Sequence, residues 1–328
     1  MFAEHRRIVV KNGTTIQTPL LLPSFSSKAF QARTVREVVE HMAPIMTDEV
    51  LISAYDLHYG ELRKTEVQFA PVVFLDSGGY EASQDMVRSS TGKGYRMSRQ
   101  WTARQLQETL ATKWDFRLPT VLVSFDGPNA RTTISRQIHR AKTMFRRWPM
   151  ANSVILLKTE KKRGALDIEE VAAYKHELAE FDVIGVTEKE LGRSILDRMV
   201  KIAKLRRALD SAGLQTPIHV FGSLDAVSSP LYFFAGADIF DGLTWLRYAF
   251  CEGNTIYKHS YGARKLGIGF EDFLLNGKMW NDNYYYLFDL KADMNKFLLD
   301  HDFCRFRYNS ELLREGYNQF RTTLVRSP

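Results

Sequence analysis

Residues 72–80 read VVFLDSGGY, so four apolar residues run directly into an aspartate, a serine and two glycines. An uninterrupted apolar run is typical of a parallel strand covered on both faces, and two glycines allow a sharp turn close to a ligand. Alone, the segment also fits an ordinary strand-to-helix turn with Asp76 as a helix cap. The pattern recurs, however, in TVLVSFDG at 120–127 and in ADIFDG at 237–242.

Three strands that each end in aspartate predict a (β/α)8 barrel, in which the loops after the strands gather distant residues at one face. Hydrophobic patterns predict the remaining elements, which are strands at 23–26, 50–54, 153–157, 182–186 and 218–221 and helices at 34–42, 168–179 and 193–212. A doubly wound open sheet is the alternative α/β fold. It ranks second because no glycine-rich phosphate loop follows any strand.

Two segments fall outside the eight repeats of strand and helix. Asn12–Gly13 between apolar strands predicts a hairpin with a type I′ turn, which we expect to plug the closed end of the barrel. Residues 270–328 are helical and aromatic in pattern, and their rings are expected to pack on the barrel more than to stack on bases. We therefore expect a barrel with its hairpin at 1–265 and a helical C-terminal extension at 266–328.

Composition is that of a globular protein, with 328 residues of which 45% are hydrophobic. The polar start predicts no signal sequence, and no apolar run approaches the ~18 residues that a membrane span needs. Two cysteines, Cys251 and Cys304, are too few for a disulfide framework and fit a reducing compartment. The expected location is the cytoplasm, away from membranes.

A formal net charge of +7 indicates an anionic partner. Basic residues concentrate at 93–104, 131–147 and 158–163, after or between the predicted site strands. The middle segment combines arginines with two aromatic residues, a mixture suited to phosphate contact: Arg131, Arg136, Arg140, Phe145, Arg146, Arg147 and Trp148. Each run alone fits a solvated helix face, but their shared position favours a nucleic-acid surface.

In these motifs the chain resembles the tRNA-guanine transglycosylase superfamily, which includes the DNA 7-deazaguanine transglycosylases. The resemblance covers 18–247. Residues 76–80 match the catalytic loop, 125–126 the base-recognition strand, 185–186 the base-lining loop, and 238–241 with Arg247 the nucleophile segment. The first and last matches are specific, whereas the middle two are short.

The resemblance implies exchange of a nucleobase with retained configuration, through a covalent bond between an aspartate and the sugar. It makes Asp241 the nucleophile and Asp76 the acid and base, and strand alternation places Asp241 inward with Ile239. The implied base-binding residues are Tyr80, Ser77, Asp126, Gly185 and, near a position where the family has a glutamine, Lys158. The nucleic-acid contacts that we expect are Arg247, Arg131, Arg140, Arg146 and Arg147.

The chain departs from the family at the zinc site of the bacterial tRNA enzymes, since Cys251, His259 and the distant Cys304 do not give four ligands. We expect no zinc and no other cofactor. Because the zinc module contacts tRNA in the bacterial enzymes, its absence modestly favours DNA over tRNA as the substrate. The expected incoming base belongs to the 7-cyano-7-deazaguanine class, and a homodimer or a modification complex fits this picture. The alternatives are a tRNA enzyme, a silent nucleic-acid-binding relative and a two-carboxylate glycosidase.

Overall fold

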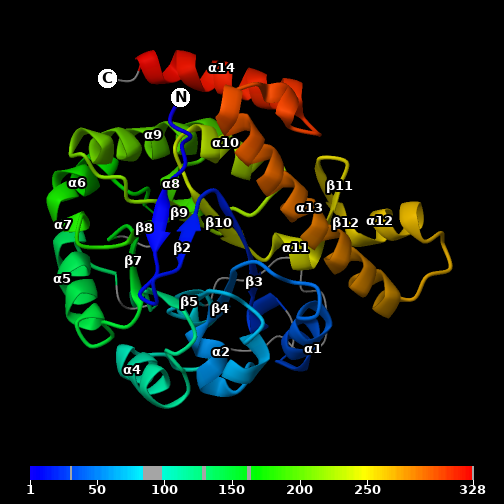
Figure 1. Ribbon diagram of the computed structural model, residues 1–328, viewed down its shortest axis with the longest axis horizontal. Helices are drawn as coiled ribbons and strands as arrows, with labels where there is room; N and C mark the ends of the chain where they lie inside the picture. Colours follow the sequence, from blue (N-terminus) through cyan, green and yellow to red (C-terminus); the bar gives the residue numbers. More distant parts are fainter. Residues whose placement is uncertain (30–31, 84–97, 128–130, 161–163, 327–328) are drawn as a thin grey trace.

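The computed structural model describes residues 1–29, 32–83, 98–127, 131–160 and 164–326. Eight parallel strands close into a barrel in the order β10-β3-β4-β5-β6-β7-β8-β9, which confirms the (β/α)8 prediction and excludes the open sheet (Figure 1). The strands are β3 (Leu20–Phe25), β4 (Val50–Ser53), β5 (Val73–Asp76), β6 (Thr120–Val123), β7 (Asn152–Leu157), β8 (Val183–Thr187), β9 (Ile218–Phe221) and β10 (Ile239–Gly242).

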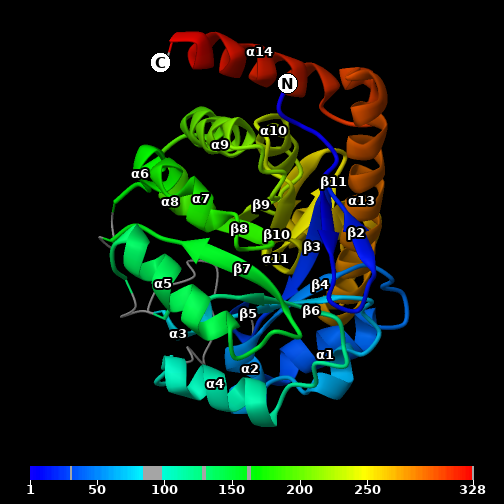
Figure 2. The same ribbon diagram turned by 60° about the vertical axis from the view of Figure 1, so that its left-hand side comes forward.

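Helices surround the barrel, as two views of the ribbon show (Figures 1 and 2). Those that follow the barrel strands are α1 (Ala32–Met42), α2 (Ala54–Tyr59), α3 (Gly79–Ala82), α4 (Ala103–Thr112), α5 (Ile134–Phe145), α6 (Ile168–Ala173), α7 (Lys175–Leu178), α8 (Glu188–Leu191), α9 (Ile195–Ser211), α10 (Ser228–Phe234) and α11 (Thr244–Arg247). The α9 helix begins after Ser194, whose hydroxyl accepts from the Asp197 amide, and Gly213 at φ +71° follows its end. The single helix predicted at 168–179 was wrong, because the backbone leaves helical geometry at Tyr174 and separates α6 from α7.

Side chains that point into the barrel form a closed apolar core. Alternate strand residues such as Leu22, Phe74 and Val121 supply it, and Ile8 and Ile16 of the N-terminal hairpin belong to the same cluster. The hairpin of β1 (Arg7–Val9) and β2 (Thr15–Gln17) therefore plugs the closed end of the barrel, as predicted.

The predicted type I′ turn of this hairpin was wrong. Gly13 has φ +91° but Asn12 does not have a positive φ, and the Gly13 amide donates to the Val10 carbonyl. This pattern is a type I turn followed by a left-handed glycine. The Asn12 side chain accepts from the Thr14 amide, which holds the asparagine in this conformation.

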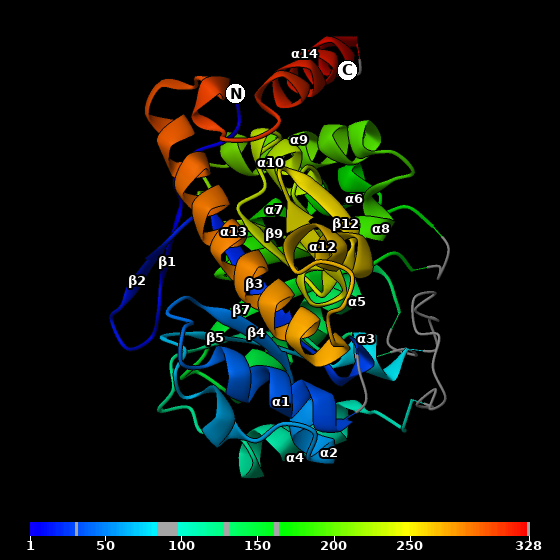
Figure 3. The ribbon, with the colours of Figure 1, turned by 90° about the vertical axis from the view of Figure 1, so that its right-hand side faces the viewer.

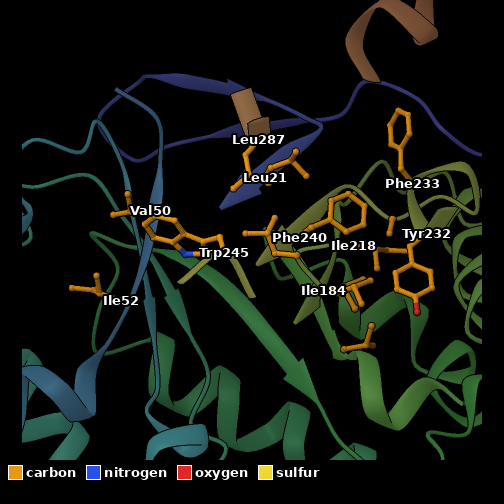
Figure 4. Packing of buried hydrophobic residues seen from close by; sticks show 14 of the residues in the cluster. Leu21, Val50, Ile52, Ile184, Ile218, Tyr232, Phe233, Phe240, Trp245 and Leu287 are labelled. Atoms are coloured by element: carbon orange, nitrogen blue, oxygen red, sulfur yellow. The ribbon is translucent and has the colours of Figure 1, made fainter. Parts of the chain in front are cut away.

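The alternate strand residues face outward and pack against the helices. Figure 4 shows part of this second cluster, with Val50, Ile184 and Ile218 on strands and Tyr232 and Phe233 on α10. Because each strand is covered on both faces, its residues are apolar nearly throughout, and this explains why the sequence showed uninterrupted runs.

The C-terminal part adds a hairpin and three helices: β11 (Tyr248–Cys251), β12 (Asn254–Tyr257), α12 (Lys258–Lys265), α13 (Asp272–Asp300) and α14 (Ser310–Arg326). Helix α13 packs against β3, α14 packs against α9 and α10, and α12 packs on α13 and the hairpin. Figure 3 shows α13 crossing one side of the barrel. Phe297, Phe303 and Phe306 are buried as predicted, whereas Tyr285 and Phe288 are exposed. Within the described residues, no helix is long and apolar enough to cross a membrane.

Candidate functional site

Because side chains alternate along a strand, two of the predicted aspartates point into the mouth of the barrel. Asp76 ends β5 and has the parity of the inward-facing Phe74, and Asp241 has the parity of the inward-facing Ile239. Asp238, of opposite parity, instead meets the buried guanidinium of Arg6. The prediction that Asp241 points inward and Asp238 does not is confirmed.

A cleft of about 820 Å³ opens at the carboxyl ends of the strands. It brings together seven residues that the sequence analysis selected, namely Asp76, Tyr80, Asp126, Arg131, Lys158, Asp241 and Arg247. This end of a (β/α)8 barrel is where catalytic groups from different loops converge. The cleft is therefore the candidate active site.

Asp241 is held by three donors from two segments, the end of β9 with the residue that follows it and strand β3. Its Oδ1 atom lies 3.0 Å from Nε2 of His219 and accepts from the Gly222 amide at 3.2 Å. Its Oδ2 atom accepts from the Ser24 hydroxyl at 3.0 Å. Three donors fix the plane of the carboxyl group, which suits a residue that must attack from one direction.

Asp76 lies in surroundings that favour its protonated form. Burial raises its pKa well above the ordinary value of 3.8, and the charges of Asp126, Glu81 and Asp241 raise it further. A hydrogen bond from the Gly78 amide to Oδ2, at 3.1 Å, opposes this shift. A carboxyl group whose pKa is raised in this way can act as a general acid and then as a base.

We expect Asp76→Asn to stabilise the fold while removing the acid and base. In the wild type the unfolded chain loses this proton near pH 3.8 and the folded chain keeps it to higher pH, so stability falls as pH rises between the two values. Asparagine does not titrate. Melting curves from pH 4 to 8 should therefore show a difference in melting temperature, in favour of the variant, that grows with pH. A constant difference would contradict the assigned protonation.

Asp126 and Lys158 form a buried ion pair at the cleft wall. Burial opposes ionisation of both groups, but their mutual attraction and hydrogen bond outweigh it, so the pKa of Asp126 is lowered and that of Lys158 is raised. The Ser77 hydroxyl donates to the second oxygen of Asp126. A Cβ atom at Gly79 would lie 2.1 Å from that oxygen, so only glycine permits this approach.

Two predicted base-binding residues lie beside the cleft and do not line it. Ser77 is fully buried and orients Asp126, so its contact with a base would be indirect. Gly185 lies behind Phe221, whose ring would be 2.7 Å from a Cβ atom there. Tyr80 does line the cleft, and Nζ of Lys28 lies 4.3 Å from the centre of its ring. The tyrosine is thus held by a cation–π contact.

The predicted nucleic-acid residues occupy three different settings. Arg247 lines the cleft, and its Nη2 atom is buried without a hydrogen-bond partner among the described residues. Arg131 also reaches the cleft, but its Nη2 atom lies 2.6 Å from the buried carboxylate of Glu190. The others lie on or directly after α5 and are exposed: Arg140, Arg146 and Arg147.

Arg140 and Arg147 line a second hollow of about 810 Å³ between α4 and α5, which shares Asp126 and Lys158 with the cleft. The basic surface therefore continues from the cleft to α5. Parts of the predicted basic segments, residues 93–97 and 161–163, lie outside the described residues.

Among the described residues, no group of three histidine, cysteine or acidic side chains could hold a metal ion. Cys251 is buried and Cys304 is exposed, and both are free thiols. Nε2 of His259 lies 3.3 Å from Asp272. The region after the nucleophile segment is instead held by Asn283 of α13, which donates to the Trp245 and Tyr248 carbonyls and accepts from the Phe250 amide.

The sequence analysis missed several buried polar residues around the aspartates. Ser24 and His219 bind Asp241, and the hydroxyls of Ser26 and Ser53 donate to Glu81. For His219 a signal existed, because it lies two residues before Phe221 on a predicted strand and so shares the inward face. Nothing in the sequence indicated that Glu81 is buried.

No protein-family model matches the chain, and no curated protein matches it. A functional assignment therefore depends on the chemistry of the cleft and on the motifs quoted above.

Proposed function

We propose that the chain is a base-exchange transglycosylase, which replaces guanine in a nucleic acid with a 7-deazaguanine base. The observation that carries the proposal is the arrangement of groups around the barrel mouth. In the closed strand order, β10, which carries Asp241, lies opposite β6, and Asp126 follows β6. Strand β5, which carries Asp76, lies next to β6 on one of the two sides between them. A base held at Asp126 would direct its sugar toward Asp241, with Asp76 beside the base.

The reaction would proceed in two displacements. An oxygen of Asp241 gives an electron pair to C1′ of the sugar, the bond from C1′ to the base nitrogen breaks, and Asp76 gives its proton to the departing base. The incoming base then loses a proton to Asp76 and attacks C1′, which releases Asp241 as a carboxylate. Two inversions retain the configuration, and no net charge or proton is consumed.

The buried pair of Asp126 and Lys158 supports a guanine-like base. Guanine presents a carbonyl oxygen beside two N–H donors along one edge, and Lys158 offers a donor beside the acceptor oxygens of Asp126. Adenine would place an amino group against the ammonium of Lys158. The lysine thus performs the donor role that the glutamine of the related family would have.

The cations along the cleft support a nucleic acid in preference to a free nucleoside. Arg247 lines the cleft, and its buried Nη2 atom has no hydrogen-bond partner in the described part of the chain. The arginines of α5 extend the positive surface beyond one nucleotide. A glycosidase acting on a neutral sugar would have no use for this surface. DNA is favoured over tRNA on the sequence evidence that the zinc module is missing.

Exchange of labelled guanine tests the proposal. The protein is incubated with radiolabelled guanine and either a guanine-containing DNA duplex, a single strand or unmodified tRNA, and label in the polymer is counted. We expect label in DNA, none in polymers without guanine, and none with the Asp241→Asn variant. Incorporation into tRNA alone would transfer the proposal to tRNA, and no incorporation into either would reject it.

A separate prediction concerns the arginines of the basic surface. Replacing Arg140, Arg146 and Arg147 with alanine should reduce the slope of log affinity against log salt concentration by about 2 to 3, for every DNA sequence tested. Phosphate contacts position a strand without reading it, so base exchange at saturating DNA should be unchanged.

The matched control for this triple variant removes three exposed arginines of α14, Arg314, Arg321 and Arg326. Helix α14 packs over α9 and α10, away from α5 (Figure 1). The control has the same net charge as the test variant. Equal slopes in both variants would mean that the effect comes from overall charge and not from the surface on α5.

A further inference from the structure

His219 is a fully buried histidine that lies directly behind the proposed nucleophile. It belongs to β9, and its Nε2 atom lies 3.0 Å from Oδ1 of Asp241. The Phe221 ring stacks on the imidazole with 3.7 Å between centres, and the Phe74 ring meets it edge-on at 6.0 Å. The two aromatic contacts hold the plane of the imidazole, and Nε2 points toward the carboxylate.

The contacts of Asp241 determine which nitrogen of His219 carries the hydrogen. An ionised carboxylate only accepts hydrogen bonds, so Nε2 is the donor. Nδ1 is buried and has no hydrogen-bond partner among the described residues. With its hydrogen on Nε2, the ring donates to Asp241, which is its one hydrogen-bond partner among the residues that the structure describes.

The two oxygens of Asp241 are held differently. Oδ1 accepts from both His219 and the Gly222 amide, and Gly222 has φ +80°, a backbone conformation that L side chains rarely adopt. Oδ2 accepts from the Ser24 hydroxyl at 3.0 Å, has no other donor within the described ranges, and so keeps a lone pair available. Asp241 lines the cleft, whereas His219 does not.

We propose that His219 is a positioning residue that holds Oδ1 as the non-reacting oxygen, so that Oδ2 forms the bond to C1′. This inference depends on the proposed function. When Oδ2 gives its electron pair to C1′ and the bond to the base breaks, Oδ1 becomes the carbonyl oxygen of an ester. When the incoming base attacks C1′, the ester bond breaks, its electron pair returns to Oδ2, and the two donors at Oδ1 stabilise the released carboxylate.

The donor of His219 therefore favours release of Asp241 over the covalent state. A hydrogen bond to a charged acceptor is roughly twice as strong as one to a neutral carbonyl. Removing the donor therefore destabilises the state with a free carboxylate more than the state with the ester. The covalent adduct should then become more populated while overall exchange slows, an outcome that a general loss of folding would not produce.

The test compares His219→Phe, which keeps an aromatic ring and loses the donor, with His219→Gln, whose side-chain amide can place a donor near the position of Nε2. Each protein is mixed with a guanine-containing strand and a fixed concentration of free guanine, and the adduct is measured on a denaturing gel. We expect the ratio of adduct to free protein to rise about tenfold in His219→Phe, with slower exchange, and to return toward the wild-type ratio in His219→Gln.

An unchanged or lower ratio in a folded His219→Phe protein would overturn the inference, as would His219→Gln behaving like His219→Phe. If neither variant folds, ¹⁵N NMR of His219 in the wild-type protein decides: hydrogen on Nε2 supports the inference and hydrogen on Nδ1 overturns it. If the wild-type protein exchanges bases and His219→Phe behaves in the same way, this inference fails while the proposed function stands. Absence of exchange in the wild type would reject both.

Discussion

Asp241→Asn is expected to abolish base exchange, with a loss of at least about 10⁴-fold. An amide nitrogen or oxygen at this position cannot replace the carboxylate that attacks C1′ and later leaves. The measurement is a denaturing gel with guanine-containing DNA and tRNA, on which the covalent adduct moves more slowly than free protein. Adduct formation by the variant would remove Asp241 from the nucleophile role.

The control for this variant is Asp182→Asn. Asp182 lies just before β8, at the closed end of the barrel, where it accepts from the amide and hydroxyl of Ser153. Asparagine keeps an acceptor oxygen there. The control should form the adduct and exchange bases at the wild-type rate, which would show that loss of a barrel carboxylate does not by itself inactivate the protein.

Asp126→Ala should have the second large effect, because it removes the acceptor for guanine and leaves Lys158 buried without its partner. The free energy with which the protein binds guanine-like bases should weaken by about 1 to 3 kcal/mol or more. Labelled guanine incorporation measures this loss. The free energy of unfolding should fall by about 3 to 5 kcal/mol, measured with denaturant, because an uncompensated buried charge is costly.

The double variant Asp126→Ala/Lys158→Met separates these two effects. It removes both charges, so it should recover most of the lost stability. It should not recover the use of guanine, since neither the donor nor the acceptor is present. Guanine incorporation at the wild-type level in a stable double variant would show that this pair does not bind the base.

The barrel could be predicted because buried parallel strands have an unmistakable composition. Residues 72–75 and 121–123 are apolar throughout, and the structure covers both of their faces. The hairpin of β11 and β12 was missed for a local reason. Its two-residue turn is Glu252–Gly253, with φ +51° and +80°, and glutamate is not a residue that normally marks such a turn.

In the site, the inward aspartates could be predicted, but the pairing of Asp126 with Lys158 and of Asp241 with His219 could not. Asp76 and Asp241 end strands, and alternation alone places them inward. Lys158 and Asp126 lie 32 positions apart in the sequence, and His219 and Asp241 lie 22 apart. Each contact joins two neighbouring segments of the barrel. Such pairs depend on side-chain direction at the barrel mouth, which hydrophobic periodicity does not specify.

Mass spectrometry of the trapped protein tests the central claim most directly. The wild-type protein is mixed with a guanine-containing oligonucleotide without free base, quenched in acid, digested with nuclease and protease, and mapped by peptide. The account predicts that the residual nucleotide mass is attached to Asp241, with one equivalent of guanine released. Attachment at another residue, or release of guanine without attachment, would contradict it.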